Sequence, residues 1–423
     1  MRTALLEIGL EELPASEFHS ILEQLETKTK ELLKANRILC DSVEVFVGSR
    51  RFGVLLRGLP EKQEGFVEEK KGPPLNVAYN KEGAPTKALE GFLKKNNASF
   101  EDIVEKDGYV YISRKIEGKT LEEVLPKVFE DLVLGMSFKK PMRWGSGEYE
   151  YVRPVHWIVA MLNDKILELT LFGLKASHFS YGKRYHSGSL EIATPDEYYE
   201  VLRSEYVMAS HEERKRSVLK QLEDFEKSHE MKVERDENLI DEIVAITEYP
   251  KILVGQFDQK YLELPEEIIV TAVKHHQRAF IARKDRLTNF FVVFQDGPQP
   301  PENVVKGYER VINARLEDAR YYFYKDLEIS LEEMNEKLKE IVFQEKLGTL
   351  YNKVERIVKI SRKICEELKF PEDFTDKVLK VASVCKADIA SKVVYEFPEL
   401  QGVMGRIYAL KGGMDEELAI AIE

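Results

Sequence analysis

Apolar residues recur every three or four positions in several stretches of the chain, and this spacing predicts helices. In the stretch 385–408 the apolar positions are Ile389, Val393, Phe397, Leu400, Met404 and Ile407. Pro398 interrupts this face, because proline lacks a backbone donor and clashes with the preceding turn, yet fits the first turn of a new helix. We therefore expect one helix to end near Glu396 and another to run from Pro398 to Gly412-Gly413.

Alternating apolar and polar residues predict strands, most clearly in the first part of the chain. Residues 5–10 should form one strand, and residues 43–47 and 52–57 a hairpin around the turn at 48–51. Further strands are expected at 109–113, 158–162, 166–172 and 290–294. Residues 60–86 hold prolines and glycines among many charges, which predicts a loop or an excursion between domains.

Helix-start signals mark further helices. Ser16 is the expected N-cap of a helix whose apolar face includes Phe18, Ile21 and Leu25. The capping-box spacing, a Ser or Thr three residues before a Glu, occurs at Thr120–Glu123, Ser210–Glu213 and Ser330–Glu333. Thr194 before Pro195 combines an N-cap with a proline at the first helical position. The chain should be mostly helical from residue 194 and all-helical from residue 330.

Length and composition place these elements in a multidomain protein. A chain of 423 residues with 43% hydrophobic residues is long enough for two to four globular domains. We expect an α+β fold class, with mixed α/β segments followed by a helical one. The predicted segments are 1–60, 61–190, 191–329 and 330–423.

Charge and cysteine usage exclude several classes of protein. The formal net charge of −12 argues against a nucleic-acid-coating protein, so RNA binding would need a local basic patch. Three widely spaced cysteines with no CxxC argue against a zinc cluster or a disulfide framework. No apolar run approaches the roughly 20 residues of a membrane span, and Met1 leads directly into a strand pattern without a signal peptide. We expect a cytoplasmic protein.

Basic and aromatic residues concentrate between residues 139 and 157. The candidate RNA-binding residues there are Lys139, Lys140, Arg143, Trp144, Arg153 and His156. Arginine forks suit phosphate oxygens, and aromatic rings stack on unpaired bases. Two alternatives stay open: Arg143 and Arg153 could form ion pairs with Glu148 or Glu150, and the tryptophans could be core residues. We favour the core for Trp157, which leads an apolar strand.

Two other segments add candidates for RNA contacts. Residues 178–187 contain Lys183, Arg184 and His186, which place positive charge and a histidine close together. The predicted helix 304–326 carries Arg310 and Arg315 among acidic residues. A helix face of mixed sign more often forms ion pairs than ligand contacts, so we favour ion pairing for this helix.

The sequence shows no means of binding ATP or a metal ion. It contains no GxxxxGK[ST] loop, and acids follow Gly145-Ser146-Gly147. His211-Glu212 begins like a zinc-binding helix, but Lys215 stands where the second histidine would be. His275 and His276 are adjacent, so on a helix they would point in different directions. We predict no catalytic and no metal-binding residue in this chain.

Several motifs occur in a consistent order: GLEELPA (9–15), GSRRFGV (48–54), KGPPLNVAYNKEGAPTKALEGF (71–92), HFSYGKRYHS (178–187), the segment 239–280 and FQEKLGTLYNKVERI (343–357). Together they resemble the beta subunit of the bacterial two-subunit glycyl-tRNA synthetase, from Glu7 to Ala409. Lys183 and Ala279 depart from the family pattern, which has a histidine and an aromatic residue there.

The resemblance implies a subunit of a glycine–tRNA ligase. Its partners would be tRNA(Gly) and an alpha subunit in an α2β2 assembly, with ATP and Mg held by the alpha subunit and no cofactor in this chain. It also implies an anticodon-binding domain beyond Glu423. Because glycine is the smallest amino acid, a tight pocket excludes larger ones, and we predict no editing activity.

The resemblance also implies two named folds. Residues 61–190 resemble the B3/B4-type module of phenylalanyl-tRNA synthetase, and residues 330–423 resemble a degenerate His-Asp phosphohydrolase domain. Ala387-Asp388 stands where a working phosphohydrolase has adjacent His and Asp ligands, and alanine cannot coordinate the metal that activates water. A metal-dependent phosphohydrolase is therefore a disfavoured alternative. A non-enzymatic scaffold without RNA affinity is the third hypothesis.

Overall fold

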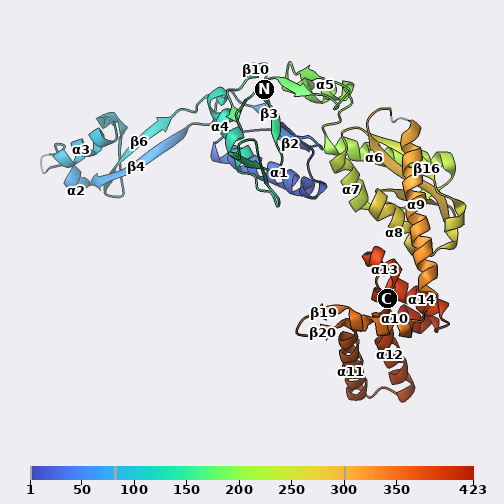
Figure 1. The fold of residues 1–423 in the computed structure, drawn as a ribbon. Coiled ribbons are helices and arrows are strands. Elements are labelled where there is room, and N and C mark those ends of the chain that lie inside the picture. The colour runs from blue at the N-terminus through green and yellow to red at the C-terminus, as the bar shows by residue number, and fades with distance from the viewer. Residues whose placement is uncertain (1, 81–82, 300–301) are drawn as a thin grey trace. The chain divides into compact units, whose positions relative to one another are not determined.

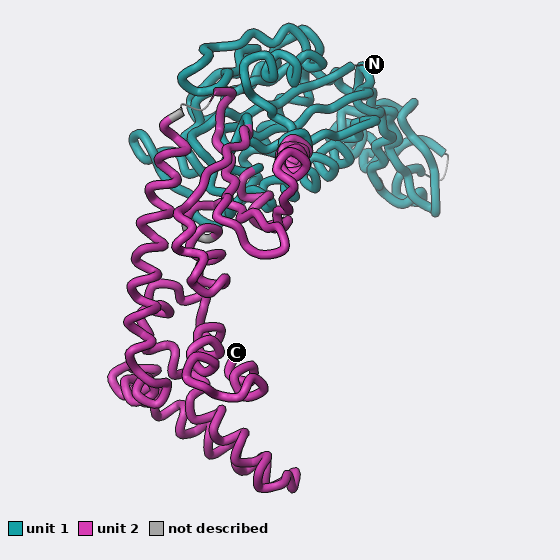
Figure 2. The backbone as a smooth tube through the Cα atoms, turned by 90° about the vertical axis from the view of Figure 1, so that its right-hand side faces the viewer, with its two compact units in different colours: residues 1–214, 244–249 teal, residues 215–243, 250–423 magenta. Residues whose placement is uncertain are grey.

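The computed structural model describes residues 2–80, 83–299 and 302–423 (Figure 1). The chain divides into two compact units (Figure 2). Unit 1 comprises Met1–Arg214 and Val244–Tyr249, and unit 2 comprises Lys215–Ile243 and Pro250–Glu423. This division is coarser than the four predicted segments, whose boundaries stay a prediction.

Unit 1 is built on a five-stranded antiparallel sheet in the order β10-β9-β1-β3-β2. Its strands are β1 (Arg2–Leu10), β2 (Ser42–Val47), β3 (Arg51–Leu59), β9 (Val155–Leu162) and β10 (Lys165–Ile166). The predicted first strand and hairpin are confirmed. The predicted strand 166–172 is split, because only β10 pairs with β9 and β11 (Thr170–Leu171) pairs with β12 (Leu174–Lys175).

Both faces of the central strand β1 are buried, which explains its nearly continuous apolar sequence. On one face, Leu5 packs with Phe46, Trp157 and Val159 against α5 (Tyr198–Ser204). The helix α1 (Phe18–Ala35) contacts β2 and β3, and α4 (Leu121–Leu134) contacts α1. The sheet is therefore the scaffold on which the rest of unit 1 packs.

A smaller sheet joins the segment 60–86, predicted as a loop or excursion, to the predicted strand at 109–113. Its order is β4-β6-β5, from β4 (Phe66–Pro74), β5 (Ile103–Lys106) and β6 (Tyr109–Ile116). The helices α2 (Leu75–Ala78) and α3 (Lys87–Lys95) pack beside it around a small core that includes Leu89, Leu93 and Val110 (Figure 1). The strand β4 has few apolar residues, so pairing with β6 defines it where hydrophobic alternation does not.

Three of the predicted side-chain caps are not formed. Thr194 precedes a 3-10 turn (Pro195–Glu197) that begins with proline as predicted, but its side chain makes no capping hydrogen bond. Ser16 lies inside a 3-10 turn at Ala15–Glu17, so α1 begins at Phe18 without a side-chain cap. Thr120 precedes α4 but its side chain caps nothing, and its backbone forms an isolated bridge with Lys62. The two downstream signals are confirmed: the Ser210 hydroxyl accepts from the Glu213 amide at 3.3 Å, and Ser330 with Glu333 forms a complete capping box.

Unit 2 contains a four-stranded antiparallel sheet in the order β15-β17-β18-β16. Its strands are β15 (Lys232–Val233), β16 (Pro250–Gln256), β17 (Phe280–Arg283) and β18 (Leu287–Asp296). The longer helices of this part of the chain are α6 (His211–His229), α7 (Glu237–Ile246), α8 (Glu266–Gln277) and α9 (Glu302–Asp326). The predicted helix 304–326 and strand 290–294 are confirmed.

The segment after residue 330 consists mainly of short helices. They are α10 (Leu331–Lys337), α11 (Leu350–Leu368), α12 (Glu372–Val384), α13 (Lys392–Glu396), α14 (Val403–Lys411) and α15 (Glu416–Ile420). The all-helical prediction misses a small hairpin of β19 (Val342–Gln344) and β20 (Gly348–Thr349), where Gly348 has a φ of +79°. Pro398 breaks the helical face as expected, but it opens a 3-10 turn, and α14 begins only after Gly402.

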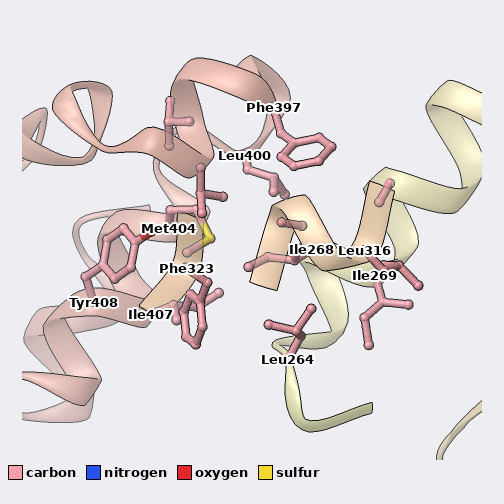
Figure 3. Packing of buried hydrophobic residues seen from close by; sticks show 14 of the residues in the cluster. Leu264, Ile268, Ile269, Leu316, Phe323, Phe397, Leu400, Met404, Ile407 and Tyr408 are labelled. Carbon is pink, nitrogen blue, oxygen red and sulfur yellow. The ribbon is translucent and has the colours of Figure 1, made fainter. Parts of the chain in front are cut away.

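One hydrophobic cluster joins the parts of unit 2 (Figure 3). It contains Leu264, Ile268, Ile269, Leu316, Phe323, Phe397, Leu400, Met404, Ile407 and Tyr408. Leu264 lies just before α8, and the others come from α8, α9 and the stretch 397–408, whose periodic apolar face therefore lies in the core of unit 2. None of the helices that the structure describes has the length and apolar character needed to cross a membrane.

Candidate functional site

A buried ion network lies on the sheet of unit 1. Arg51 of β3 donates through Nη1 to Oε1 of Glu7 on β1 and through Nε to Oε1 of Glu248, each at 2.9 Å. The Ser180 hydroxyl donates to the same Glu7 oxygen at 3.0 Å, and the Tyr181 carbonyl accepts from Arg51 Nη2 at 2.8 Å. Burial alone would lower the pKa of Arg51, but the carboxylates of Glu248 and Glu7 more than offset this and raise it.

The network joins residues from four separate parts of the chain. Glu7 precedes the GLEELPA motif, Arg51 belongs to GSRRFGV, Ser180 lies in the segment 178–187, and Glu248 lies in the segment 239–280. None of these four residues was among the candidates predicted from the sequence. The one available signal was a charged residue inside an otherwise apolar strand, since a glutamate at position 7 is buried only if it is paired.

A mixed-sign cluster lies at the surface next to this network. His156 Nε2 lies 2.9 Å from Glu11 Oε1, and Arg184 Nη1 lies 3.0 Å from Glu11 Oε2 and 2.6 Å from Glu12 Oε1. Burial would raise the pKa of Glu12, but its own backbone amide and Arg184 lower it by hydrogen bonding. The structure thus brings the candidates His156 and Arg184 together, around two acids that partly balance their charge.

The other two arginine candidates of unit 1 differ from each other. Arg143 Nε pairs with Glu150 at 2.9 Å across the hairpin of β7 (Met142–Trp144) and β8 (Tyr149–Tyr151), with both side chains exposed. The ion-pair alternative is therefore seen for Arg143. Arg153 instead donates to backbone carbonyls, of Glu12 at 3.1 Å and Val152 at 2.7 Å. These hydrogen bonds connect the GLEELPA segment to the residues just before β9.

The two tryptophans also differ. Trp157 is 6% exposed and lies so close to β1 that a Cβ at Gly9 would come within 1.8 Å of its Cε2. The core interpretation is confirmed for Trp157. Trp144 is half-buried, with its ring centroid 6.0 Å from that of Tyr149 and 5.9 Å from that of Phe172. It belongs to a surface aromatic cluster.

The remaining candidates of unit 1 lie in loops. Lys139 and Lys140 are exposed between α4 and β7, and the Lys139 amide donates to Glu17. The turn that follows Gly182 contains Lys183 and His186, whose amide donates to the Lys183 carbonyl at 2.9 Å. The His186 ring lies 6.1 Å from the ring of Tyr206. Lys139 and Lys140 are thus exposed cations that form no ion pair among the described residues.

Arg310 and Arg315 belong to α9 in unit 2. Arg315 Nη1 pairs with Glu396 at 3.1 Å, and its guanidinium lies 5.4 Å from the ring centroid of Phe397. Arg310 is exposed. The favoured ion-pair interpretation is thus seen for Arg315, which links α9 to the end of α13.

Ala387 and Asp388 occupy the position that the family resemblance assigned to metal ligands, and here they have a structural role. Ala387 and Asp388 are fully buried, and Asp388 Oδ2 accepts from the amides of Gly402 at 2.6 Å and Gly405 at 3.1 Å. The carboxylate therefore caps α14, and its burial raises the pKa of Asp388. Within residues 2–80, 83–299 and 302–423 no three His, Cys, Asp or Glu side chains gather to hold a metal ion. The side chains of His275 and His276 lie outside the described residues.

Comparison with known proteins gives one consistent result. Residues 4–423 match the family described as glycyl-tRNA synthetase beta subunit. The chain is 86% identical over 423 residues to a protein of Thermotoga neapolitana and 73% identical to one of Thermotoga maritima. It is 36% identical over 428 aligned residues to a protein of Oceanobacillus iheyensis. All three relatives are named glycine–tRNA ligase beta subunit.

The alignments cover the whole of this chain but only part of each relative. The chain spans 63% of the length of the two Thermotoga proteins and 62% of that of the Oceanobacillus protein. The match nevertheless includes each segment that carries a residue of the buried network. The chain belongs to the glycyl-tRNA synthetase beta subunit family.

Proposed function

We propose that this chain acts as part of the beta subunit of a glycine–tRNA ligase, which binds tRNA(Gly) and docks an alpha subunit in an α2β2 assembly. The alpha subunit forms glycyl-adenylate and transfers glycine to the tRNA. The observation that carries the proposal is the match over residues 4–423 to this family, together with 86% identity to a protein named as that subunit. The cytoplasm is the location that the proposal implies.

The division of labour follows from the chemistry that the sequence lacks. Activation of an amino acid requires a site that holds a triphosphate, and this sequence contains no GxxxxGK[ST] loop. The alpha subunit therefore supplies the site for ATP and Mg in this proposal. This chain contributes by binding tRNA and holding it near the catalytic site, which raises the effective concentration of tRNA there.

Support for tRNA binding comes from the surface of unit 1. Lys139 and Lys140 are exposed, and a separate surface cluster of His156, Arg184, Glu11 and Glu12 carries both signs of charge. Because the cluster is nearly neutral and the chain has a net charge of −12, the protein should not bind every polyanion through charge alone. Selective contact with a folded RNA then depends on where each cation lies.

The helical segment 330–423 has a structural role in this proposal. Asp388, which in a working His-Asp phosphohydrolase would help hold the metal, has its Oδ2 engaged by two backbone amides. The neighbouring Ala387 offers no ligand atom. We expect neither phosphohydrolase activity from this segment nor editing of mischarged tRNA by unit 1.

The proposal is tested by reconstitution. The full-length beta subunit and its alpha subunit are purified separately, and transfer of radiolabelled glycine to tRNA(Gly) is measured for each alone and for the mixture. The mixture should elute as one assembly and charge the tRNA, while the beta subunit alone should charge none. Failure of the two subunits to associate, or charging by the mixture at the rate of the alpha subunit alone, would contradict the proposal.

A further inference from the structure

A pocket of about 310 Å³ lies in unit 1 beside the buried network. Its walls include His156, Trp157, Lys175, Phe179, Tyr181 and Ser189. The volume is at the lower end of the range for small-molecule sites, about 300–1,000 Å³. Trp157 is almost wholly buried, so it contributes a fixed wall.

The strand β13 (Phe179–Tyr181) gives the pocket its aromatic wall. Its three residues alternate: Ser180 is fully buried, while Phe179 and Tyr181 are each 40% exposed. Arg51 holds this strand in place, because it donates both to the Ser180 hydroxyl at 3.2 Å and to the Tyr181 carbonyl. Two large aromatic rings are thus kept at the surface by a network that fixes the strand beneath them.

The ionisable groups of the pocket favour an anion. No Asp or Glu is among the residues that line it, although the chain has more acidic than basic residues. Lys175 is exposed, and it belongs to none of the ion pairs among the described residues. The two acids beside the pocket are already engaged, Glu11 by His156 at 2.9 Å and Glu191 by His178 at 3.4 Å.

Exposed aromatic rings next to a lysine are the two components of a single-strand RNA site, because bases stack on the rings and phosphate meets the cation. We propose that this pocket binds one unpaired nucleotide of the tRNA, with its base against Phe179 or Tyr181 and its phosphate at Lys175. The inference rests on the proposed function and names the part of the RNA that unit 1 contacts. His156 lies at the same pocket, where it is held by Glu11.

The test uses the α2β2 enzyme reconstituted from full-length subunits, with tRNA(Gly) affinity measured over a series of salt concentrations. Phe179→Ala and Tyr181→Leu are measured separately, and loss of the ring on which the base stacks should weaken binding by roughly 5- to 150-fold, the range for one stacked base. Tyr181→Phe keeps the ring and should bind normally. Tyr395→Ala removes a ring that is 85% exposed in unit 2, and it is the matched control.

The salt series separates stacking from charge. Phe179→Ala should leave the slope of log K against log salt unchanged, while Lys175→Ala should reduce it by about 1. A merely structural role for Lys175 would not change this slope.

Three results would overturn the inference. If the wild-type enzyme binds tRNA and Phe179→Ala, Tyr181→Leu and Lys175→Ala bind it equally well, the pocket holds no nucleotide, although the proposed function stands. If the aromatic variants lose the alpha subunit but keep tRNA affinity, the surface is a protein interface. If the wild-type enzyme itself does not bind tRNA, the proposed function fails, and this inference fails with it.

Discussion

Arg51 and Glu7 form an ion pair across the neighbouring strands β3 and β1, with Nη1 and Oε1 2.9 Å apart and neither side chain exposed to solvent. The second carboxylate, Glu248, comes from a segment almost two hundred residues further along the chain. Removing charges from water costs several kcal/mol each, and only close pairing compensates for it. The arginine therefore holds together segments that would otherwise carry uncompensated buried charge.

Replacement of this arginine should be strongly destabilising. Arg51→Met keeps the approximate length of the side chain but removes the guanidinium that pairs with both buried carboxylates, Glu7 and Glu248, which should lower the free energy of unfolding by about 3–5 kcal/mol. Arg143→Met is the control, because Arg143 pairs with Glu150 at the surface and its loss should cost at most about 1 kcal/mol. Urea denaturation of the two variants measures the difference. An Arg51 variant as stable as the control would show that the network contributes little.

Gly9 should tolerate no side chain. A Cβ there would lie 1.8 Å from Trp157 Cε2, so Gly9→Ala should displace the indole and destabilise unit 1 by about 1–3 kcal/mol. Gly91→Ala makes the same chemical change within α3, where nothing lies within 4 Å, and should stabilise that helix by about 0.5–1 kcal/mol. Thermal unfolding followed by Trp fluorescence and circular dichroism should shift in opposite directions for the two variants. A shift of the same sign would contradict the packing described here.

The stability of unit 2 should depend on the protonation of Asp388. Burial raises the pKa of this carboxyl group, although Gly402, Gly405 and Lys386 act in the opposite direction. A raised folded-state pKa means that the stabilising contribution is complete below the ordinary value, about 3.9, and is lost as pH rises through the folded-state value.

Asp388→Asn removes this titration and keeps an oxygen that can accept from the two amides. The stability of the wild-type protein relative to Asp388→Asn should therefore fall as pH rises from 4 to 7 in urea denaturation. A difference that is constant, or that grows with pH, would show that burial does not control this group.

Lys139 and Lys140 should contribute more to tRNA affinity than Arg143. Both ammonium groups are exposed and belong to none of the ion pairs among the described residues, whereas Arg143 already pairs with Glu150. A Lys139→Ala/Lys140→Ala variant should reduce the salt dependence of tRNA binding by about 1–2 in slope.

The control for these lysines changes the net charge equally. Lys30 and Lys127 each pair with an acid one turn away on their own helix, so Lys30→Ala/Lys127→Ala should leave the slope unchanged. Filter binding of tRNA(Gly) at several salt concentrations measures both double variants. Equal slopes for the two would remove Lys139 and Lys140 from the set of phosphate contacts.

Local signals in the sequence predicted local structure. The break at Pro398, the hairpin of β2 and β3 and the capping box of Ser330 with Glu333 each depend on residues a few positions apart. The failures came where distant pairing decides the outcome. The strand β4 is highly charged and is defined by pairing with β6, and Thr120 takes part in a backbone bridge with Lys62.

The candidate site also shows that local features were predictable and distant contacts were not. Lys139 and Lys140 could be proposed as surface cations from their sequence neighbourhood, and the structure leaves them exposed. Phe179, Tyr181 and Lys175 gave no joint signal, because they line one pocket only when β12 and β13 both pack beside β9. Likewise, Glu7, Ser180 and Glu248 come together only in the folded chain, and local periodicity in the sequence carries no information about such distant contacts.

The most direct test of the central claim is glycine-dependent exchange of pyrophosphate into ATP by the isolated full-length beta subunit. Because the proposed function assigns the ATP site to the alpha subunit, the beta subunit should show no exchange above background, and addition of the alpha subunit should restore it. Exchange by the beta subunit alone, abolished by neither repurification nor removal of traces of alpha subunit, would contradict the account.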